Sequence, residues 1–525
     1  MMRRRTLLQG LAVTASLSTP AVAQPGKVRT LRFVPQSNLP TLDPMFSSEV
    51  VANHGFYVFD TLYSADSKGV AQPQMAAGHT VSDDGRTWRI RLRDGLKFHD
   101  GTPVLAADCA ASLERWSRLD AFGKLLAKAV EQWGAPDDRT VEIRLMRPFP
   151  LLLDAIGKAQ SQVAFMLPER LARTDPFKSI TEIIGSGPYR FRPDEYVNGS
   201  RVAYERFEGY VPRQEPPDWA SGGKVAHFPR VEWHVIPDAA TANAALLAGE
   251  VDWWELPLPD LYPALKASRD IVLPVDNPDG RVSFMRMNHL QPPFNDVRVR
   301  RAVLAAVEQA DYLQAMMGDD VALWHRCRSE FPCGSPYAVE ADSRLMPGDQ
   351  VAARALLKEA GYGGQTAVVL NPTDNPLINP LGEVTADLLR RIGMKADLAT
   401  SDWGTVVQRR SSREPVEKGG WSILHSYGSA TGYANPAVNP LLRGAGLEGW
   451  FGWWDSPQSE ALMQTWLDAA DADARVLAGR NLGRLAMDEV AIVPLGQWFG
   501  RTAYRRSITG VLPGGAPYPW NVRPA

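Results

Sequence analysis

The chain has few cysteines, no long apolar run beyond its first residues and almost no excess of charge of one sign. Three cysteines in 525 residues do not make a disulfide-rich scaffold. A formal net charge of -2 creates no global field that would attract nucleic acid or an anionic membrane. The composition, 45% hydrophobic and 22% charged, is instead that of an ordinary globular protein, with room for two to four domains at about 150 residues each.

Local catalytic and metal-binding motifs are missing as well. The chain contains no HExxH helix motif, no GxSxG nucleophile elbow and no GxxxxGK[ST] phosphate loop. Its eight histidines are scattered, and none stands at metal-ligand spacing from a cysteine or another histidine. We therefore expect neither an enzyme nor a metalloprotein, although two catalytic carboxylates far apart in sequence would leave no such trace.

The first 23 residues have the features of an export signal. Three arginines at 3–5 precede a short apolar segment, and Ala-Val-Ala at 21–23 forms an A-x-A cleavage site. Arg-Arg-Thr-Leu-Leu at 4–8 resembles a twin-arginine signal, and the alternative is a general secretory signal with an additional arginine. No cysteine follows to carry a lipid anchor. We expect a periplasmic protein, cleaved near Ala23.

The cysteines fall into two groups. Cys327 and Cys333 bracket a short loop, where an oxidising compartment favours a disulfide; the alternative is two unpaired thiols. Cys109 shares a helical stripe with Leu113 and Trp116, which predicts a buried core residue.

Strand, turn and helix signals alternate along the rest of the chain. Trp88, Ile90 and Leu92 alternate with arginines between two Asp-Gly turns, which predicts a half-buried strand. Further strands are expected over 140–145, 189–191, 231–236, 282–287, 366–370 and 395–398. Helices are expected over 238–248, 296–309, 351–360 and 381–392. Their alternation across 281–425 indicates an α/β domain.

Several segments, in this order, resemble the family 5 extracellular solute-binding proteins, the dipeptide-, oligopeptide- and nickel-binding receptors of ABC importers. The segments are TLDP (41–44), VSDDGRTW (81–88), LRDGLKFHDGTPVLAADCAASLERW (92–116), GSGPYRF (185–191), IPDAATANAALLAGEVD (236–252), RMNHLQPPFNDVRVRRAVLAAVEQ (286–309) and AARALLKEAGY (352–362). The resemblance covers nearly the whole chain after the signal.

The resemblance implies an α/β fold of the two-lobed periplasmic binding protein type (type II, cluster C-like) with an extra inserted subdomain. Domain I would comprise residues 24–57, 182–280 and 495–525, domain II residues 58–181, and domain III residues 281–494. Two strands near 277–286 and 491–497 would form the hinge. The lobes would close over a solute held between them.

The resemblance also implies which residues hold that solute. In oligopeptide-binding relatives a Trp and an Arg seven residues later line the pocket, and Trp403 and Arg410 match that spacing. A second family element begins with Gly-Trp, matched by Trp421, and continues to an Asp that holds the α-ammonium group of a peptide. Leu424 stands at that acidic position, which argues against a free peptide N-terminus unless another carboxylate replaces it.

Other candidate ligand residues come from family positions or from the polar loop after residue 424. They are Ser47, Ser48 and Glu49 after TLDP, Tyr427 and Asn435 in that loop, and Trp498 beyond the second hinge strand. Glu49 or Glu417 could replace the missing carboxylate, and His425 could bind a metal chelate. For each candidate the alternative is an ordinary packing or surface residue.

The expected function is capture of a peptide or peptide-like organic solute and its delivery to the membrane permease of an ABC importer. The protein would be a monomer that is not embedded in the membrane, binds no nucleic acid and needs no cofactor. A nickel-type metal chelate is the alternative solute. A secreted hydrolase and a sensory or chaperone-like module that binds a partner protein are the alternatives of other classes.

Overall fold

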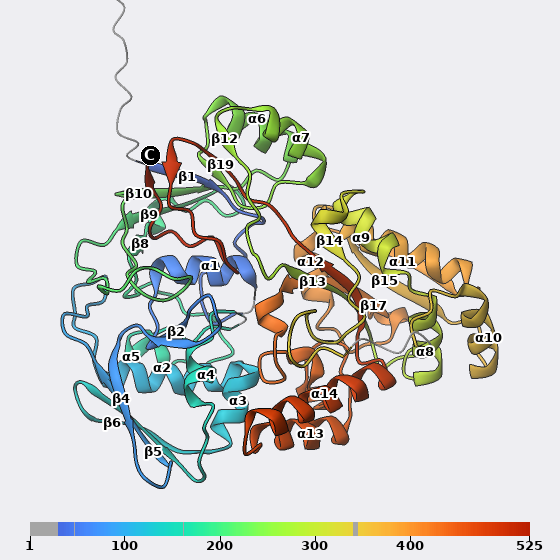
Figure 1. The fold of residues 1–525 in the computed structure, drawn as a ribbon, viewed down its shortest axis with the longest axis horizontal. Helices are drawn as coiled ribbons and strands as arrows, with labels where there is room; N and C mark the ends of the chain where they lie inside the picture. The colour runs from blue at the N-terminus through green and yellow to red at the C-terminus, as the bar shows by residue number, and fades with distance from the viewer. Residues whose placement is uncertain (1–29, 47, 161, 340–344) are drawn as a thin grey trace, which may run out of the picture.

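Three large sheets, each with its own helices, organise the part of the chain that the structure describes (Figure 1), and two sheets of two strands accompany them. The computed structural model describes residues 30–46, 48–160, 162–339 and 345–525. The expected export signal and Ser47 lie outside these ranges. We use domain I, domain II and domain III for the parts built on the seven-stranded, the four-stranded and the six-stranded sheet.

The sheet of domain I gathers strands from both ends and the middle of the chain, in the order β12-β19-β11-β1-β10-β9-β8. The strands are β1 (Thr30–Val34), β8 (Tyr189–Phe191), β9 (Arg201–Arg206), β10 (Arg230–His234), β11 (Trp253–Trp254), β12 (Ile271–Val272) and β19 (Ala503–Arg505). β1 is parallel to both β10 and β11. Helices α1 (Glu49–Val58), α6 (Ala239–Ala248) and α7 (Tyr262–Ala267) belong to this domain. α1 is buried on nearly every side, as its apolar sequence requires.

Domain II is inserted into domain I and contains the sheet β4-β5-β7-β6. Its strands are β4 (Ala76–Val81), β5 (Thr87–Leu92), β6 (Val130–Asp137) and β7 (Thr140–Leu145), and the hairpin β2 (Tyr63–Ala65) and β3 (Ala71–Pro73) stands beside them. Its helices are α2 (Ala106–Leu119), α3 (Ala121–Ala127), α4 (Leu152–Gly157) and α5 (Glu169–Ala172). The alternation expected over 88–92 is confirmed, because Trp88, Ile90 and Leu92 are buried and the arginines between them are exposed.

Domain III contains the sheet β14-β18-β13-β17-β15-β16. Its strands are β13 (Arg281–Met287), β14 (Trp324–His325), β15 (Thr366–Pro372), β16 (Lys395–Ser401), β17 (Ile423–Ser429) and β18 (Val493–Trp498). Its helices are α8 (Val297–Ala306), α9 (Gln309–Met317), α10 (Gln350–Ala360), α11 (Asn379–Arg391), α12 (Trp403–Arg409), α13 (Pro457–Leu467) and α14 (Ala472–Glu489). β13 lies between β17 and β18 and is antiparallel to both.

The connections between domains I and III overlap the expected hinge strands only at 277–280 and otherwise lie next to them. β13 and β18 pair along their lengths inside the domain III sheet, so the expected boundary between residues 494 and 495 falls inside β18. The chain crosses at 273–280 and again at 499–502. These two segments are antiparallel neighbours, with a bridge between Val275 and Arg501 and a hydrogen bond from Thr502 N–H to Pro274 O of 3.1 Å. The two crossing segments are therefore hydrogen-bonded to each other and lie side by side, and their role as a hinge stays a prediction.

A fully buried ion pair joins the TLDP segment to domain II. Asp43 and Arg115, on α2, are both 0% exposed at their side chains, and their closest oxygen and nitrogen lie 3.2 Å apart. Asp43 also accepts the backbone N–H groups of Met45 and Ile180. The motif aspartate thus fixes the loop that leads into α1.

The cysteines and the apolar segments follow simple packing. Cys327 and Cys333 are joined by a disulfide with a Cα–Cα distance of 5.8 Å, and Cys109 is 0% exposed in the core of domain II. Across the part of the chain that the structure describes, no helix is both long and apolar enough to cross a bilayer.

Candidate solute site between the lobes

The first turn of α1 places Glu49 against domain III. The helix begins there because Ser48 caps it, its hydroxyl oxygen accepting the N–H of Val51 at 3.3 Å. One Glu49 carboxylate oxygen accepts the backbone N–H of Ser429, at the end of β17, at 3.0 Å. The other accepts the side-chain amide of Gln36 at 3.1 Å. Glu49 therefore lies at the interface between domains I and III and retains free lone pairs on both oxygens.

A second carboxylate, Glu255, lies behind Glu49. Gln36 donates its backbone N–H (2.8 Å) and its side-chain amide (3.2 Å) to Glu255, and Asn53 donates at 3.0 Å. Burial raises the pKa of Glu255 to about 7, and the nearby charge of Glu49 adds to the rise, whereas the Gln36 N–H and Arg281 act against it. Domain I thus presents two carboxylates and a shared amide to the interface.

Neither Gln36 nor Glu255 was expected from the sequence. The two residues lie far apart along the chain, and neither belongs to a ligand motif. Only the order of strands in the sheet could have pointed to these two residues. Gln36 follows β1 and Glu255 follows β11, two parallel neighbours, and ligands of α/β sheets collect at the carboxyl ends of such strands.

Tyr427 reaches across the interface from domain III. Its hydroxyl donates to the side-chain oxygen of Gln36 at 3.1 Å. Its ring packs edge-on against Trp498, with ring centroids 5.2 Å apart. Trp498 is 0% exposed and donates its indole N–H to the Ser283 hydroxyl at 2.9 Å. Trp498 therefore supports the ring of Tyr427 from behind, and its expected contact with a solute stays a prediction.

Trp403 and Arg410 stand at the two ends of α12, as the motif spacing requires. Trp403 is half-buried beside Val406, and Arg410 lies over the ring of Phe451, with its guanidinium carbon 4.7 Å from the ring centre. Burial lowers the pKa of Arg410 to about 10. Among the residues that the structure describes, no carboxylate pairs with Arg410, and its Nε has no hydrogen-bond partner.

The neighbouring Arg409 has a different environment. Its guanidinium donates to the carbonyl oxygens of Gly419 and Gly420 at 3.0 and 2.7 Å. This arginine anchors the end of α12 to the next segment. Of the two adjacent arginines, only Arg410 keeps its guanidinium available for an anion.

Trp421 and Leu424 lie in an apolar cluster beneath α12. Trp421 is 0% exposed and donates its indole N–H to the backbone oxygen of Arg410 at 3.1 Å. Leu424 is 2% exposed in the same cluster, together with Trp453. The indole thus holds the backbone of Arg410 from below, and the expectation that Trp421 itself lines the pocket stays a prediction. The position of the family's acidic residue is part of the domain III core.

Three further candidates have local roles. Asn435 accepts the N–H groups of Ala437 and Val438 at 3.0 and 3.2 Å and so stabilises its own loop. Glu417 is exposed on a short 3₁₀ helix. His425 is 1% exposed and contacts Thr385 inside domain III, where burial lowers its pKa to about 3. Within the described ranges, no cluster of three or more His, Cys, Asp or Glu could hold a metal ion.

Tyr433 lies near both Glu49 of domain I and Arg410 of domain III. Burial raises the pKa of its hydroxyl, the charge of Glu49 raises it further and that of Arg410 lowers it, so both charged groups lie near this one ring. A run of aromatic contacts leads from Tyr433 toward Arg410, with ring-centroid distances of 5.2 to 5.9 Å; it passes through Phe284, Trp450 and Phe451.

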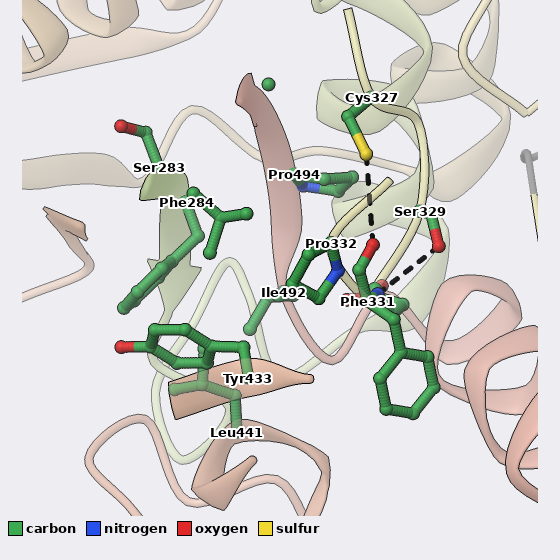
Figure 2. A pocket seen from close by; sticks show the side chains of 13 residues that line it. Ser283, Phe284, Cys327, Ser329, Phe331, Pro332, Tyr433, Leu441, Ile492 and Pro494 are labelled. Atoms are coloured by element: carbon green, nitrogen blue, oxygen red, sulfur yellow. Dashed lines mark hydrogen bonds between the residues drawn. The ribbon is translucent and has the colours of Figure 1, made fainter. Parts of the chain in front are cut away.

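A small internal cavity of about 20 Å³ lies on the other side of Tyr433 (Figure 2). Figure 2 shows Tyr433 and Phe284 on one side of it and the disulfide loop, including Cys327 and Pro332, on the other. This volume accommodates about one water molecule. The cavity belongs to the interior of domain III and is too small for a peptide-sized solute.

A half-buried arginine without a counter-ion among the described residues and the carboxylate Glu49 of the facing domain thus lie near one tyrosine, Tyr433. The chain belongs to the bacterial extracellular solute-binding proteins, family 5, whose model matches residues 70–444. It is 38% identical, over 100% of its own length and 99% of the other, to a probable peptide ABC transporter periplasmic-binding protein of Sinorhizobium fredii. It is 29% identical to a glutathione-binding protein of Salmonella typhi, over 77% of this chain and 76% of that protein.

Solved structures show the same fold. A binding protein of A. tumefaciens R10 in complex with agropinic acid has a TM-score of 0.80 at 20% identity, covering 94% of this chain and 99% of that one. A Pseudoalteromonas dipeptide-binding protein in complex with Met-Leu has a TM-score of 0.80 at 19% identity, covering 94% and 100%. The two-lobed periplasmic binding protein fold expected from the sequence is confirmed.

Proposed function

We propose that this protein captures a peptide or peptide-like solute that carries a carboxylate, binds that carboxylate at Arg410, and delivers the solute to the permease of an ABC importer. The observation that carries the proposal is the half-buried Arg410 guanidinium, which has no counter-ion among the described residues. A buried charge without a partner is costly, and a planar guanidinium suits a carboxylate in two-pronged geometry.

The opposite end of the solute would carry a hydrogen-bond-donating amine. Domain III offers no acid at position 424, because Leu424 is packed in the core. Glu49 of domain I lies near the same tyrosine as Arg410 and has lone pairs to spare. The acidic partner would thus come from the opposite lobe, so that one solute must contact both lobes. Closure then becomes favourable when the solute is present.

Exchange of Arg410 for methionine tests the proposal. Binding is measured by calorimetry and thermal shift against Met-Leu, trialanine, glutathione, agropinic acid and a nickel–histidine chelate. For each solute that binds the native protein, Arg410→Met should weaken binding by about 10-fold to 150-fold, the worth of a hydrogen bond to a charged group. Arg410→Lys should recover part of this loss, because the charge returns without the planar fork.

Arg409→Met is the matched control for that exchange. Since Arg409 donates to two carbonyl oxygens of its own domain, its loss should lower the melting temperature and leave affinity unchanged. Arg410→Met should instead weaken solute binding and leave the melting temperature nearly unchanged. Equal affinity of the Arg410→Met and native proteins for every bound solute would contradict the proposal, as would equal affinity for a peptide and its C-terminal amide.

The same panel separates the two rival functions. If the natural solute is a metal chelate, the protein should bind the nickel–histidine chelate and show no difference in affinity between a peptide and its C-terminal amide. A secreted hydrolase would convert one of the peptides to products detectable by mass spectrometry, whereas a receptor returns every solute intact. The relatives are transport proteins by name, which supports the receptor.

Export to the periplasm and the monomeric state complete the proposal. The signal-like residues 1–23 support export, by the twin-arginine or the general secretory route. N-terminal sequencing of protein recovered from the periplasm tests cleavage near Ala23, and gel filtration coupled to light scattering tests the monomer.

A further inference from the structure

Hydrogen bonds made by the protein itself join the two lobes beside the hinge. Tyr427 of domain III donates to the Gln36 side-chain oxygen, and Ser429 N–H donates to Glu49. Farther from the hinge, Arg443 of domain III donates to Ala121 O of domain II at 3.4 Å. The structure is thus a closed conformation whose lobes are joined by bonds within the chain.

The orientation of the Gln36 amide decides whether the bond to Tyr427 can form. An amide has one accepting oxygen and one donating NH₂ group, at opposite corners of the same plane. Both carboxylates of domain I take the NH₂ end: Glu49 at 3.1 Å and Glu255 at 3.2 Å. The oxygen end therefore faces domain III, where a tyrosine hydroxyl can donate to it.

Glu255 is itself fixed in place. It is 4% exposed, and besides the Gln36 side chain it accepts the Gln36 backbone N–H and the Asn53 amide. Tyr427 is fixed on its side, because Trp498 packs against its ring. Neither end of the contact depends on a long, freely rotating surface side chain, so little side-chain entropy is lost when the bond forms.

We propose that Glu255 and Gln36 are positioning residues that latch the lobes through Tyr427 and keep a fraction of the protein closed before any solute binds. A binding site that is formed only in part of the population has its apparent affinity reduced by that fraction. The latch therefore determines how much of the intrinsic affinity the protein realises. It extends the proposed function, but it concerns closure alone and needs no solute to be tested.

The test measures the distance between the lobes in solute-free protein by electron–electron resonance of spin labels. The labels are attached at Asp83→Cys in domain II and Glu359→Cys in domain III, both exposed positions, while Cys109 is buried. Tyr427→Phe removes one hydroxyl and should lower the closed-to-open ratio by about twofold to tenfold, the worth of one neutral hydrogen bond. Gln36→Leu should lower it at least as far.

Coupling distinguishes a latch from general loosening. Adding Tyr427→Phe to Gln36→Leu should lower the ratio no further, because the bond is already lost. Glu255→Gln should lower the ratio less than Gln36→Leu, since the amide can still accept one of its bonds. Tyr312→Phe is the matched control, because that hydroxyl contacts Thr385 inside domain III, and it should leave the distances unchanged.

Two results would overturn the latch: identical distance distributions for Tyr427→Phe and the native protein, or additive shifts in the double variant. Melting temperatures of each variant verify that it is folded. Because no solute is present, failure here leaves the binding results for Arg410 untouched, and failure of those results leaves the latch untouched.

Discussion

Glu255 combines near-complete burial at the interface with three accepted hydrogen bonds. Its carboxylate accepts three N–H groups, yet burial still raises its pKa from 4.5 to about 7. Burial is the largest cause, and among the surrounding charges Arg281 lowers the pKa whereas Glu49 and Asp276 raise it. Desolvation of the carboxylate therefore has the larger effect, and the folded protein holds a proton that the unfolded chain releases.

This raised pKa predicts that stability falls as the pH rises. Between pH 4.5 and about 7 the folded state binds the Glu255 proton more tightly than the unfolded state, so each step up in pH favours unfolding. The free energy of unfolding falls by about 3 kcal/mol in total over this range, and the loss is complete above pH 7. Glu255→Gln should flatten this part of the stability curve and raise the melting temperature at pH 8, measured by calorimetry from pH 4.5 to 8.

An exposed exchange provides the comparison. Glu417→Gln should reproduce the native slope, since Glu417 lies at the surface. A slope for Glu255→Gln equal to the native one would show that the proton is bound elsewhere.

At the scale of the element, motif residues hold loops in place. Gly185 of the GSGPYRF segment is one example, since a Cβ there would lie 1.9 Å from the backbone oxygen of Val58, the last residue of α1. Only glycine permits the two segments to approach so closely. Asp43 of TLDP is the other, through its buried pair with Arg115. Both motifs fix the position of α1, which carries Glu49.

Asp43→Ala should therefore destabilise the protein strongly. It leaves Arg115 buried without its carboxylate and removes two N–H acceptors, a change that costs about 3–5 kcal/mol for a buried pair. Unfolding in urea, followed by tryptophan fluorescence, measures the loss. Asp84→Ala breaks an exposed pair with Arg86 in the same half of the chain and should have a far smaller effect. Equal losses would contradict this role of Asp43.

Local sequence patterns predicted the elements better than the site. The alternation over 88–92 and the spacing of Trp403 and Arg410 depend on neighbours in sequence, and the structure contains the strand and the helix that they imply. The roles of Trp421 and Trp498 depend on which side of a strand or loop faces the core, and both indoles turned out to be buried. Gln36 and Glu255 become neighbours only through the pairing of β1 with β11, a contact that no local pattern encodes.

At the scale of the whole molecule, the sheet order makes domain I depend on the end of the chain. β19 lies between β11 and β12, and Tyr518 and Trp520 are 0% exposed, with Tyr518 packed against Phe56 of α1. Removing residues 503–525 would leave two strand edges unpaired and an aromatic core open.

We therefore expect the chain truncated after residue 502 to lose the cooperative melting transition of the native protein and to aggregate, as followed by circular dichroism and light scattering. Removal of only residues 523–525, which are exposed, should leave melting nearly unchanged. A soluble, cooperatively melting 502-residue chain would show that domain I folds without its last strand.

The position of β19 also bears on the timing of export. While the ribosome is still producing the final residues, the sheet of domain I lacks the strand that lies between β11 and the edge strand β12, and the two lobes have only one of their two connections. Folding of that domain must then wait until translation is finished. A general secretory route could thread such an unfinished chain, whereas a twin-arginine route would receive it only after release from the ribosome.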